Sequence, residues 1–205
     1  MSHVDSYFKE AVEIIRKIDR SQIERMIKLL VNIRDKKGRL FFLGVGGGAG
    51  NCSHAVNDFR KIAGFESYTP VDNVSELTAR TNDEGWHTVF SEWLKNSNID
   101  EKDGVFVFSV GGGNREKNIS TNIVNALEYA KSRCAKIMGV VGRDGGYTAA
   151  VADVCVVVPT VNPENVTAHT ESFQSLIWHL IISHPDVMVH GMKWESTITA
   201  GRNKE

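Results

Sequence analysis

The sequence is short of three features that would each point to a class of protein. It has no strong charge of either sign, since its 205 residues carry a net charge of -1, so we expect no nucleic-acid partner. Its three cysteines, Cys52, Cys134 and Cys155, are scattered and form no C-x-x-C, which indicates reduced thiols and a cytoplasmic location. No apolar run is long enough to span a membrane, and the polar first residues are unlike a leader, so we expect no membrane partner.

Glycine, in contrast, is plentiful within residues 39–59. Residues 40–45 predict a buried strand, and a helix is expected to open near Asn51. The glycines between them are Gly46, Gly47, Gly48 and Gly50. Because the free N–H groups at the start of a helix bind anions, this stretch predicts a phosphate site. It lacks the lysine of a P-loop and fits a dinucleotide fingerprint poorly, so a purely structural turn is the alternative.

Two pairs of ionisable residues lie on predicted helices. His54 and Asp58 are four residues apart, which places an imidazole and a carboxylate on one helix face, where they can bind a metal ion. Glu171 and His179 on the last helix are eight residues apart, about 12 Å along an ideal helix. A carboxylate near a helix start is favoured by the dipole, and a histidine in an apolar helix is often a core residue. Spacing alone therefore leaves the role of this second pair open.

Short β-branched runs alternate with helical segments along most of the chain. Runs of this kind mark strands that are buried on both faces of a parallel sheet. We therefore predict an α/β fold with a doubly wound five-stranded parallel sheet in a three-layer sandwich. The strands are expected at 40–45, 67–71, 105–110, 137–141 and 154–158, and the helices at 51–62, 74–81, 85–96, 117–132, 148–152 and 166–183.

Two further helices are expected before the sheet, at residues 4–18 and 21–38. Ser21, with Glu24 three residues later, has the pattern of a capping box. Because these helices have no obvious sheet to cover, we expect a helical hairpin that packs on a partner subunit. The chain, residues 1–205, is thus predicted to be one domain made of a hairpin (1–38), an α/β core (39–184) and a tail (185–205).

Sheets of this type bind ligands at the carboxyl ends of their strands. A second glycine-rich loop follows the predicted third strand and would hold a phosphate through its N–H groups. Arg115 would supply a counter-charge there, unless it only begins a solvated helix. Asn82 and Asp83 lie near the same edge, in a cluster typical of helix caps. The second loop consists of Ser109, Gly111, Gly112, Gly113, Asn114 and Arg115, with Val110 between the first two.

These motifs together resemble the sugar isomerase (SIS) domain family, and within it the phosphoheptose isomerases. The resemblance covers nearly the whole chain and is most specific at residues 82–86 (NDEGW), at residues 142–146 (GRDGG) and at the two histidines His54 and His179. It implies a homotetramer with active sites between subunits, a zinc ion, and the interconversion of a ketose phosphate and an aldose phosphate, with sedoheptulose 7-phosphate as the substrate.

The resemblance also implies roles for individual residues. Asp58 or Glu171 would act as the base and His179 as the acid, while Asn82 and Asp83 would contact the substrate. The phosphate would bind at Gly46, Gly47 and Gly48 and at the second loop. The zinc ligands would be His54, Asp58, Glu171 and His179.

Three departures from the family pattern bear on this prediction. The two glycine loops lack an amide and three hydroxyls that the family carries, so phosphate would be held mainly by backbone N–H groups. Asp58 replaces a glutamate, and Glu171 replaces a glutamine, which makes the site more acidic. We predict a metal-assisted phosphosugar isomerase. A non-catalytic sugar-phosphate binder or interaction scaffold is the alternative, and the loop spacing disfavours a nucleotide binder.

Overall fold

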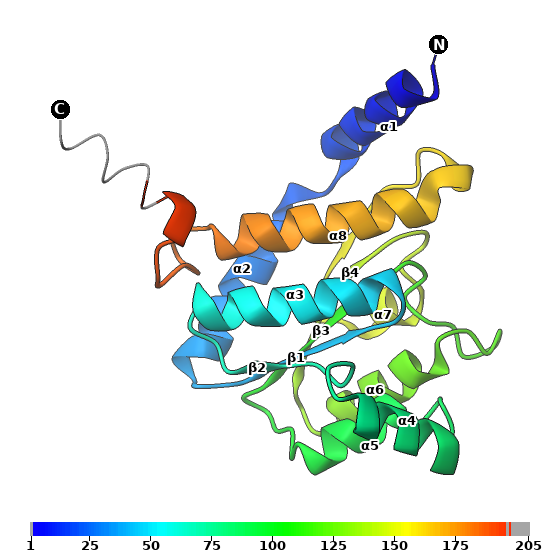
Figure 1. Cartoon of the computed structure of the whole chain (residues 1–205), viewed down its shortest axis with the longest axis vertical. Coiled ribbons are helices and arrows are strands. Elements are labelled where there is room, and N and C mark those ends of the chain that lie inside the picture. Colours follow the sequence, from blue (N-terminus) through cyan, green and yellow to red (C-terminus); the bar gives the residue numbers. More distant parts are fainter. Residues whose placement is uncertain (1, 196, 198–205) are drawn as a thin grey trace.

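A five-stranded parallel sheet forms the centre of the protein in the computed structural model, which describes residues 2–195 and 197. The strand order is β2-β1-β3-β4-β5, and helices cover both faces (Figure 1). The predicted α/β fold is therefore confirmed. The strands are β1 (Leu40–Gly44), β2 (Ser67–Tyr68), β3 (Gly104–Ser109), β4 (Lys136–Val141) and β5 (Val154–Val157).

The helices divide between the two faces of the sheet according to which side chains they bury. Alternate strand residues point to opposite faces, so that Phe42 and Phe106 lie in one core layer and Phe41 and Val105 in the other. None of the helices within the described residues is long and apolar enough to cross a membrane. The first layer is covered by α2 (Arg20–Asp35), α3 (Gly47–Lys61) and α8 (Val166–Ile182), and the second by α4 (Val74–Asp83), α5 (Val89–Asn96), α6 (Thr121–Ser132) and α7 (Gly146–Val151).

The boundaries of several elements differ from the sequence prediction. Strand β2 stops at Tyr68 rather than continuing to residue 71, because Pro70 has no N–H to donate to a ladder. Helix α2 is capped by Asp19, whose carboxylate accepts a hydrogen bond from the Ser21 N–H at 2.9 Å, so the predicted capping box at Ser21 is wrong. Helices α5 and α6 each begin four residues later than predicted, at Val89 and Thr121.

The N-terminal region is helical, as predicted, but it does not form a hairpin. Helix α2 belongs to the core and packs on β5 and α8, with Met26 and Leu30 fully buried. Helix α1 (His3–Lys17) projects beyond the first turns of α8 instead of folding back along α2 (Figure 1). The prediction that both helices lie outside the α/β core is therefore wrong for α2. The last residues of the predicted tail, 196 and 198–205, lie outside the described residues.

Helix α1 is held by a carboxylate as well as by Ile14, which is fully buried in the first core layer. Glu10 accepts hydrogen bonds from the side chains of Asn162 at Oε1 (2.8 Å) and Asn165 at Oε2 (2.9 Å), and His169 Nε2 lies 2.8 Å from the same Oε2. These hydrogen bonds, that from Asn165 first, lower the pKa of Glu10 to about 2. The ring of Tyr7 stacks on His169 with centroids 4.3 Å apart. Helix α1 is thus attached to the start of α8 by a polar contact.

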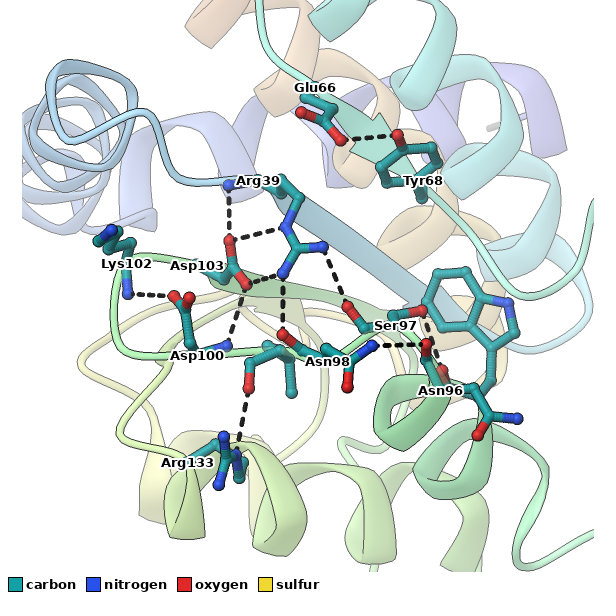
Figure 2. Close-up of polar contacts among 12 residues, drawn as sticks. Arg39, Glu66, Tyr68, Asn96, Ser97, Asn98, Asp100, Lys102, Asp103 and Arg133 are labelled. Carbon is teal, nitrogen blue, oxygen red and sulfur yellow. Dashed lines mark hydrogen bonds and ion pairs between the residues drawn. The ribbon is translucent and has the colours of Figure 1, made fainter.

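An arginine and an aspartate connect the amino ends of two strands (Figure 2). Asp103 precedes β3 and is 2% exposed. It accepts hydrogen bonds from the Arg39 guanidinium at 3.2 and 2.7 Å and from the Arg39 N–H at 2.8 Å. The same guanidinium donates to the carbonyls of Ser97 and Asn98, both at 3.0 Å. This pair therefore fixes β1, β3 and the loop after α5 at the edge opposite the strand carboxyl ends.

We expect Asp103→Asn to lower the free energy of unfolding by about 3 kcal/mol, because it leaves the buried part of the Arg39 guanidinium without its carboxylate. Urea unfolding followed by circular dichroism measures this. The control is Glu92→Gln, which removes a carboxylate of an exposed pair with Lys95 and should change stability by less than about 1 kcal/mol. Equal effects of the two substitutions would contradict the role assigned to Asp103.

The glycines after β1 allow α3 to lie very close to the sheet. Helix α3 begins at Gly47 rather than near Asn51, because Gly46 turns the chain with a φ of 59° and acts as its N-cap. A Cβ on Gly44 would collide with the backbone of Gly48, and a Cβ on Gly48 would collide with the carbonyl oxygen of Phe108. Most of the predicted glycine turn is thus the first turn of a helix packed on β1 and β3.

We expect Gly48→Ala to destabilise the protein by about 1–3 kcal/mol, because the new methyl group meets backbone atoms that cannot move aside. Gly50→Ala is the matched control on the same helix. No atom lies within 4 Å of a Cβ at Gly50, so this substitution should stabilise the helix by up to about 1 kcal/mol. Thermal unfolding of both variants tests the difference, and a stable Gly48→Ala protein would show that the close contact is not required.

Candidate active site

Helices α3 and α8 lie side by side on one face of the sheet and run in the same direction (Figure 1). Asn51 of α3 donates hydrogen bonds to the Glu171 carbonyl and to Gln174 Oε1 of α8, both at 3.0 Å. Gln174 is fully buried and donates in turn to the Val140 carbonyl of β4 at 3.2 Å. These contacts fix the relative position of the two helices and of the side chains one to two turns further along.

Three of the predicted ionisable residues come together between these helices. His54 and Asp58 of α3 and His179 of α8 each offer one ligand atom, and the three atoms lie within 4.8 Å of one another. His54 Nε2 is 3.5 Å from an Asp58 carboxylate oxygen, and the two imidazole rings meet edge to face with centroids 5.4 Å apart. The i, i+4 spacing on α3 and the parallel course of α8 produce this arrangement. We refer to it as the His54/Asp58/His179 cluster.

The hydrogen bond of His179 determines which of its ring nitrogens faces the cluster as an acceptor. Nδ1 lies 2.7 Å from the carbonyl oxygen of Ser175, which can only accept, so Nδ1 carries the proton. Nε2 is then left with a lone pair. A backbone carbonyl that holds the far nitrogen of an imidazole is the usual support for a metal-binding histidine. Trp178 fixes the neighbouring rings, since its fully buried indole stacks on His179 and meets His54 edge to face.

These donors fit a divalent metal ion. Two imidazoles and one carboxylate are ligands that zinc prefers, and three protein ligands leave a coordination position for a substrate oxygen. Among the described residues, this is the group of histidine, cysteine, aspartate and glutamate side chains that could hold an ion. The cluster is therefore a possible metal site. Cys52, two residues before His54, is completely buried and is not part of this group, and burial raises the pKa of its thiol above the usual range.

Glu171 does not join the cluster, in contrast to the predicted set of four ligands. Its carboxylate lies against Gly47 at the start of α3, where a Cβ would collide with it. The eight residues between Glu171 and His179 correspond to about 12 Å of helix, and both lie within the single continuous helix α8. A carboxylate at the N-terminus of α3 is favoured by the helix dipole. It also places a negative charge beside Gly46, Gly47 and Gly48, where the sequence predicts a phosphate.

The second glycine loop is packed against the loop that follows β4. The Gly112 N–H donates to Ser109 Oγ at 3.0 Å, and the Gly112 carbonyl accepts from the Thr148 N–H at 2.9 Å and from its hydroxyl at 2.7 Å. A Cβ on Gly112, which has a φ of 67°, would collide with the Gly145 carbonyl. Gly113 has a φ of 83° and accepts from the Tyr147 N–H. A Cβ on Gly111 would make only an ordinary contact, with Arg143 at 3.9 Å. Glycine is therefore required at position 112 so that this loop can pack against the loop after β4.

The polar residues at the end of this loop have partners within the chain. Asn114 accepts a hydrogen bond from the Lys117 N–H at 2.8 Å. Arg115 forms an ion pair with Glu128 of α6, so its charge is balanced inside the protein rather than directed at the His54/Asp58/His179 cluster. A surface pocket of about 350 Å³ lies beside Asn114 and Arg115 and is bounded by Asp144 and Tyr147. The structure therefore leaves an open space here that is separate from the cluster.

Asn82 and Asp83 lie far from the cluster in a single chain. They are the last residues of α4, which covers the opposite face of the sheet (Figure 1). Both side chains are exposed, and the Asn82 amide donates to the Asp83 carboxylate at 2.8 Å. The structure does not bring this pair together with His54, Asp58 or His179.

A larger pocket, of about 730 Å³, opens beside the cluster. Asp58 and His179 line it, and so do Lys61 at the end of α3 and a C-terminal segment, residues 190–195. Neither Lys61 nor this segment was predicted from the sequence as part of the site. Lys61 could have been found, because it follows Asp58 by three residues and so shares its helix face. The segment has no sequence pattern that would have placed it there.

Comparisons with known proteins show which sequences and folds this chain is similar to. Two relatives are each 31% identical to this chain. The lincomycin biosynthesis protein LmbN of Streptomyces lincolnensis matches 77% of the chain, which spans 59% of that protein. A phosphoheptose isomerase of Sulfurimonas denitrificans matches 78% of the chain and 80% of its own length. The solved structure of phosphoheptose isomerase GmhA from Neisseria gonorrhoeae has the same fold, with a TM-score of 0.74 at 24% identity over 87% of this chain and 94% of that one.

The family model of the SIS domain matches residues 6–142, which include β1, the glycine stretch, His54, Asp58 and the second loop. The C-terminal part of the candidate site, with Glu171 and His179, lies beyond that match. The chain therefore belongs to the SIS domain family.

Proposed function

We propose that this protein is a phosphosugar isomerase that interconverts a ketose phosphate and an aldose phosphate, with sedoheptulose 7-phosphate as its substrate. The observation that carries the proposal is the meeting of His54, Asp58 and His179 beside a pocket, in a chain of the SIS domain family. Curated relatives named phosphoheptose isomerase, which match most of the chain, support the choice of substrate. A sensor or scaffold would have no use for such a cluster, which disfavours the non-catalytic alternative.

The reaction moves a proton between neighbouring carbons through an ene-diol, so it needs a base at carbon and a group that moves the hydroxyl proton. Asp58 is proposed as the base, in preference to Glu171, because Glu171 is about 12 Å of helix away from His179. His179 accepts the hydroxyl proton at Nε2, which its Nδ1 hydrogen bond to Ser175 leaves unprotonated, and returns it to the neighbouring oxygen. The apolar contact with Trp178 holds its ring in place.

One divalent ion, proposed to be zinc, would be held by His54 and Asp58 together with substrate or solvent oxygens, because the Nε2 lone pair of His179 is used for the hydroxyl proton. Glu171 is no longer proposed as a ligand. When bound, the ion would polarise the substrate carbonyl and so stabilise negative charge on its oxygen. Asp58 has two carboxylate oxygens, so one can serve the ion while the other takes the proton.

Because the Glu171 carboxylate occupies the space beside Gly47, we assign the phosphate mainly to the second loop, which begins beside Gly48. The proposed contacts of the phosphate are Ser109, Gly111, Gly113 and Asn114, with Gly46, Gly48, Gly112 and Arg115 at the edge of its site. Asn82 and Asp83 of a partner subunit are proposed to contact the sugar.

We expect the purified protein to convert sedoheptulose 7-phosphate to an aldose phosphate, detected by nuclear magnetic resonance. His179→Ala should lower kcat by about 100-fold or more, because it removes the group that moves the hydroxyl proton. His184→Ala, on the turn after α8, is the control and should leave kcat unchanged.

Elemental analysis should find about one zinc per chain, and less in His54→Ala. Tight binding of the sugar phosphate without turnover would instead support the non-catalytic alternative, and a metal-free active protein would contradict the metal site.

We further propose that the protein is a cytoplasmic homotetramer and that residues 1–205 form one SIS domain. Three unpaired cysteines support the cytoplasm, and the packing of α2 and Val187 into the core supports a single domain. A tetramer is supported by the apolar side chains that α1 exposes on its outer side. They are Val4, Phe8, Val12 and Ile15, each between 43% and 66% exposed.

We expect Phe8→Glu to reduce the oligomer to smaller species in sedimentation velocity, because it places a charge in the centre of this apolar stripe. Lys28→Glu, at an exposed polar position on α2, is the control and should sediment as the parent does. A parent protein that sediments as a monomer would contradict the tetramer.

A further inference from the structure

The C-terminal segment is attached to the body of the protein beside the end of α3. The Arg34 guanidinium donates to the carbonyls of Val187 at 2.7 Å and Asp186 at 2.8 Å, and Val187 is fully buried. The N–H groups of Val189 and His190 both donate to the Ile62 carbonyl, at 3.0 and 2.9 Å. These contacts use a carbonyl that the end of the helix would otherwise leave unpaired. They hold the following residues, 190–195, over the pocket.

The pocket beneath this segment combines the cluster with a positive charge. Asp58, Lys61 and His179 line it from the helices, and the segment contributes His190, Lys193, Trp194 and Glu195. Lys61 is three residues beyond Asp58 and therefore on the same side of α3. Its neighbour Arg60 points elsewhere and donates to the Ser67 carbonyl at 3.0 Å. Within the described residues, the Lys61 side chain makes no hydrogen bond and no ion pair.

A lysine in this position suits a reaction that creates negative charge on oxygen. Ene-diol chemistry turns a carbonyl into an anionic oxygen, and a cationic donor placed at that oxygen in a partly enclosed pocket stabilises the transition state more than the ground state. The phosphate, in contrast, is assigned to the other end of α3, so Lys61 is not needed to hold it. The carboxylate of Asp58 is directed at the His54 imidazole, at 3.5 Å, and leaves the lysine available to the substrate.

We propose that Lys61 is a catalytic residue of this site, whose ammonium group donates a hydrogen bond to the anionic oxygen of the ene-diolate within the pocket closed by residues 190–195. The inference rests on the proposed isomerase function. Lys61 keeps its proton throughout, so no proton transfer beyond those of Asp58 and His179 is required.

The test compares two ligands that are not turned over. A heptonohydroxamate 7-phosphate imitates the ene-diolate, whereas the reduced heptitol 7-phosphate has the same phosphate and hydroxyls but no anionic oxygen. Calorimetry of Lys61→Ala should show the hydroxamate binding about 100-fold more weakly and the heptitol binding within about threefold of the parent. Turnover of sedoheptulose 7-phosphate should fall by a similar factor in kcat with little change in KM, and Lys61→Arg should recover part of it.

Lys131→Ala is the matched control, because Lys131 is also an exposed lysine in the last turn of a helix, on the opposite face of the sheet. Lys131→Ala removes a charge that is favourable at the end of a helix, as Lys61→Ala does. It should change neither the affinity for the two ligands nor the turnover of the sugar phosphate. Unchanged hydroxamate binding in Lys61→Ala would overturn the proposal, as would an equal loss for both ligands, which would indicate a general charge effect. If the parent binds the hydroxamate through Lys61 without turning over the sugar, the proposed function fails while the contact stands.

Discussion

The close approach of α3 to the sheet is the constraint on which the candidate site depends. Gly44 and Gly48 carry no side chains that would separate the helix from the backbone of β1 and β3. Because α3 lies this close to the sheet, α8 can lie beside it over the same strands, where the Gln174 side chain donates a hydrogen bond to the Val140 carbonyl. His54 and His179, far apart in the sequence, then face each other across the two helices. The glycines that suggest a ligand loop are thus first of all a requirement of packing.

The sequence predicted the sheet better than the helix starts. Strands such as β3 and β4 are buried on both faces, so their apolar runs are continuous and their ends are clear. Helix α3 was predicted to begin four residues late, because glycine has a low helix propensity and only the contacts with β1 and β3 stabilise Gly47 and Gly48 in a helical turn. The prediction of an N-terminal helical hairpin was wrong for a similar reason. The apolar stripe of α2 did not reveal that it faces β5 and α8.

The candidate site was predictable where one helix supplies the geometry. The spacing of His54 and Asp58 was enough to place them together, whereas His179 depended on the family resemblance. The prediction of Glu171 as a ligand was wrong because the rise of the helix separates it from His179. This distance follows from their spacing in the sequence. Lys61 was missed because a lysine in the last turn of a helix is usually explained by the dipole alone. Its position in a pocket depends on the C-terminal segment, which no local pattern could place.

The parallel course of α3 and α8 orders the chemical groups of the site along one line. Gly47 meets Glu171 at the start of both helices, Asn51 meets Gln174 one turn later, and His54 meets His179 beyond them, with Lys61 at the far end. A metal-capable cluster in the middle of such a line can act on one end of an extended molecule while the other end reaches the strand ends. Ene-diol chemistry requires a sugar in its open-chain form, since only that form has a carbonyl. A line of contacts favours the open chain over the compact ring, so the arrangement of the two helices is itself suited to selecting the reactive form.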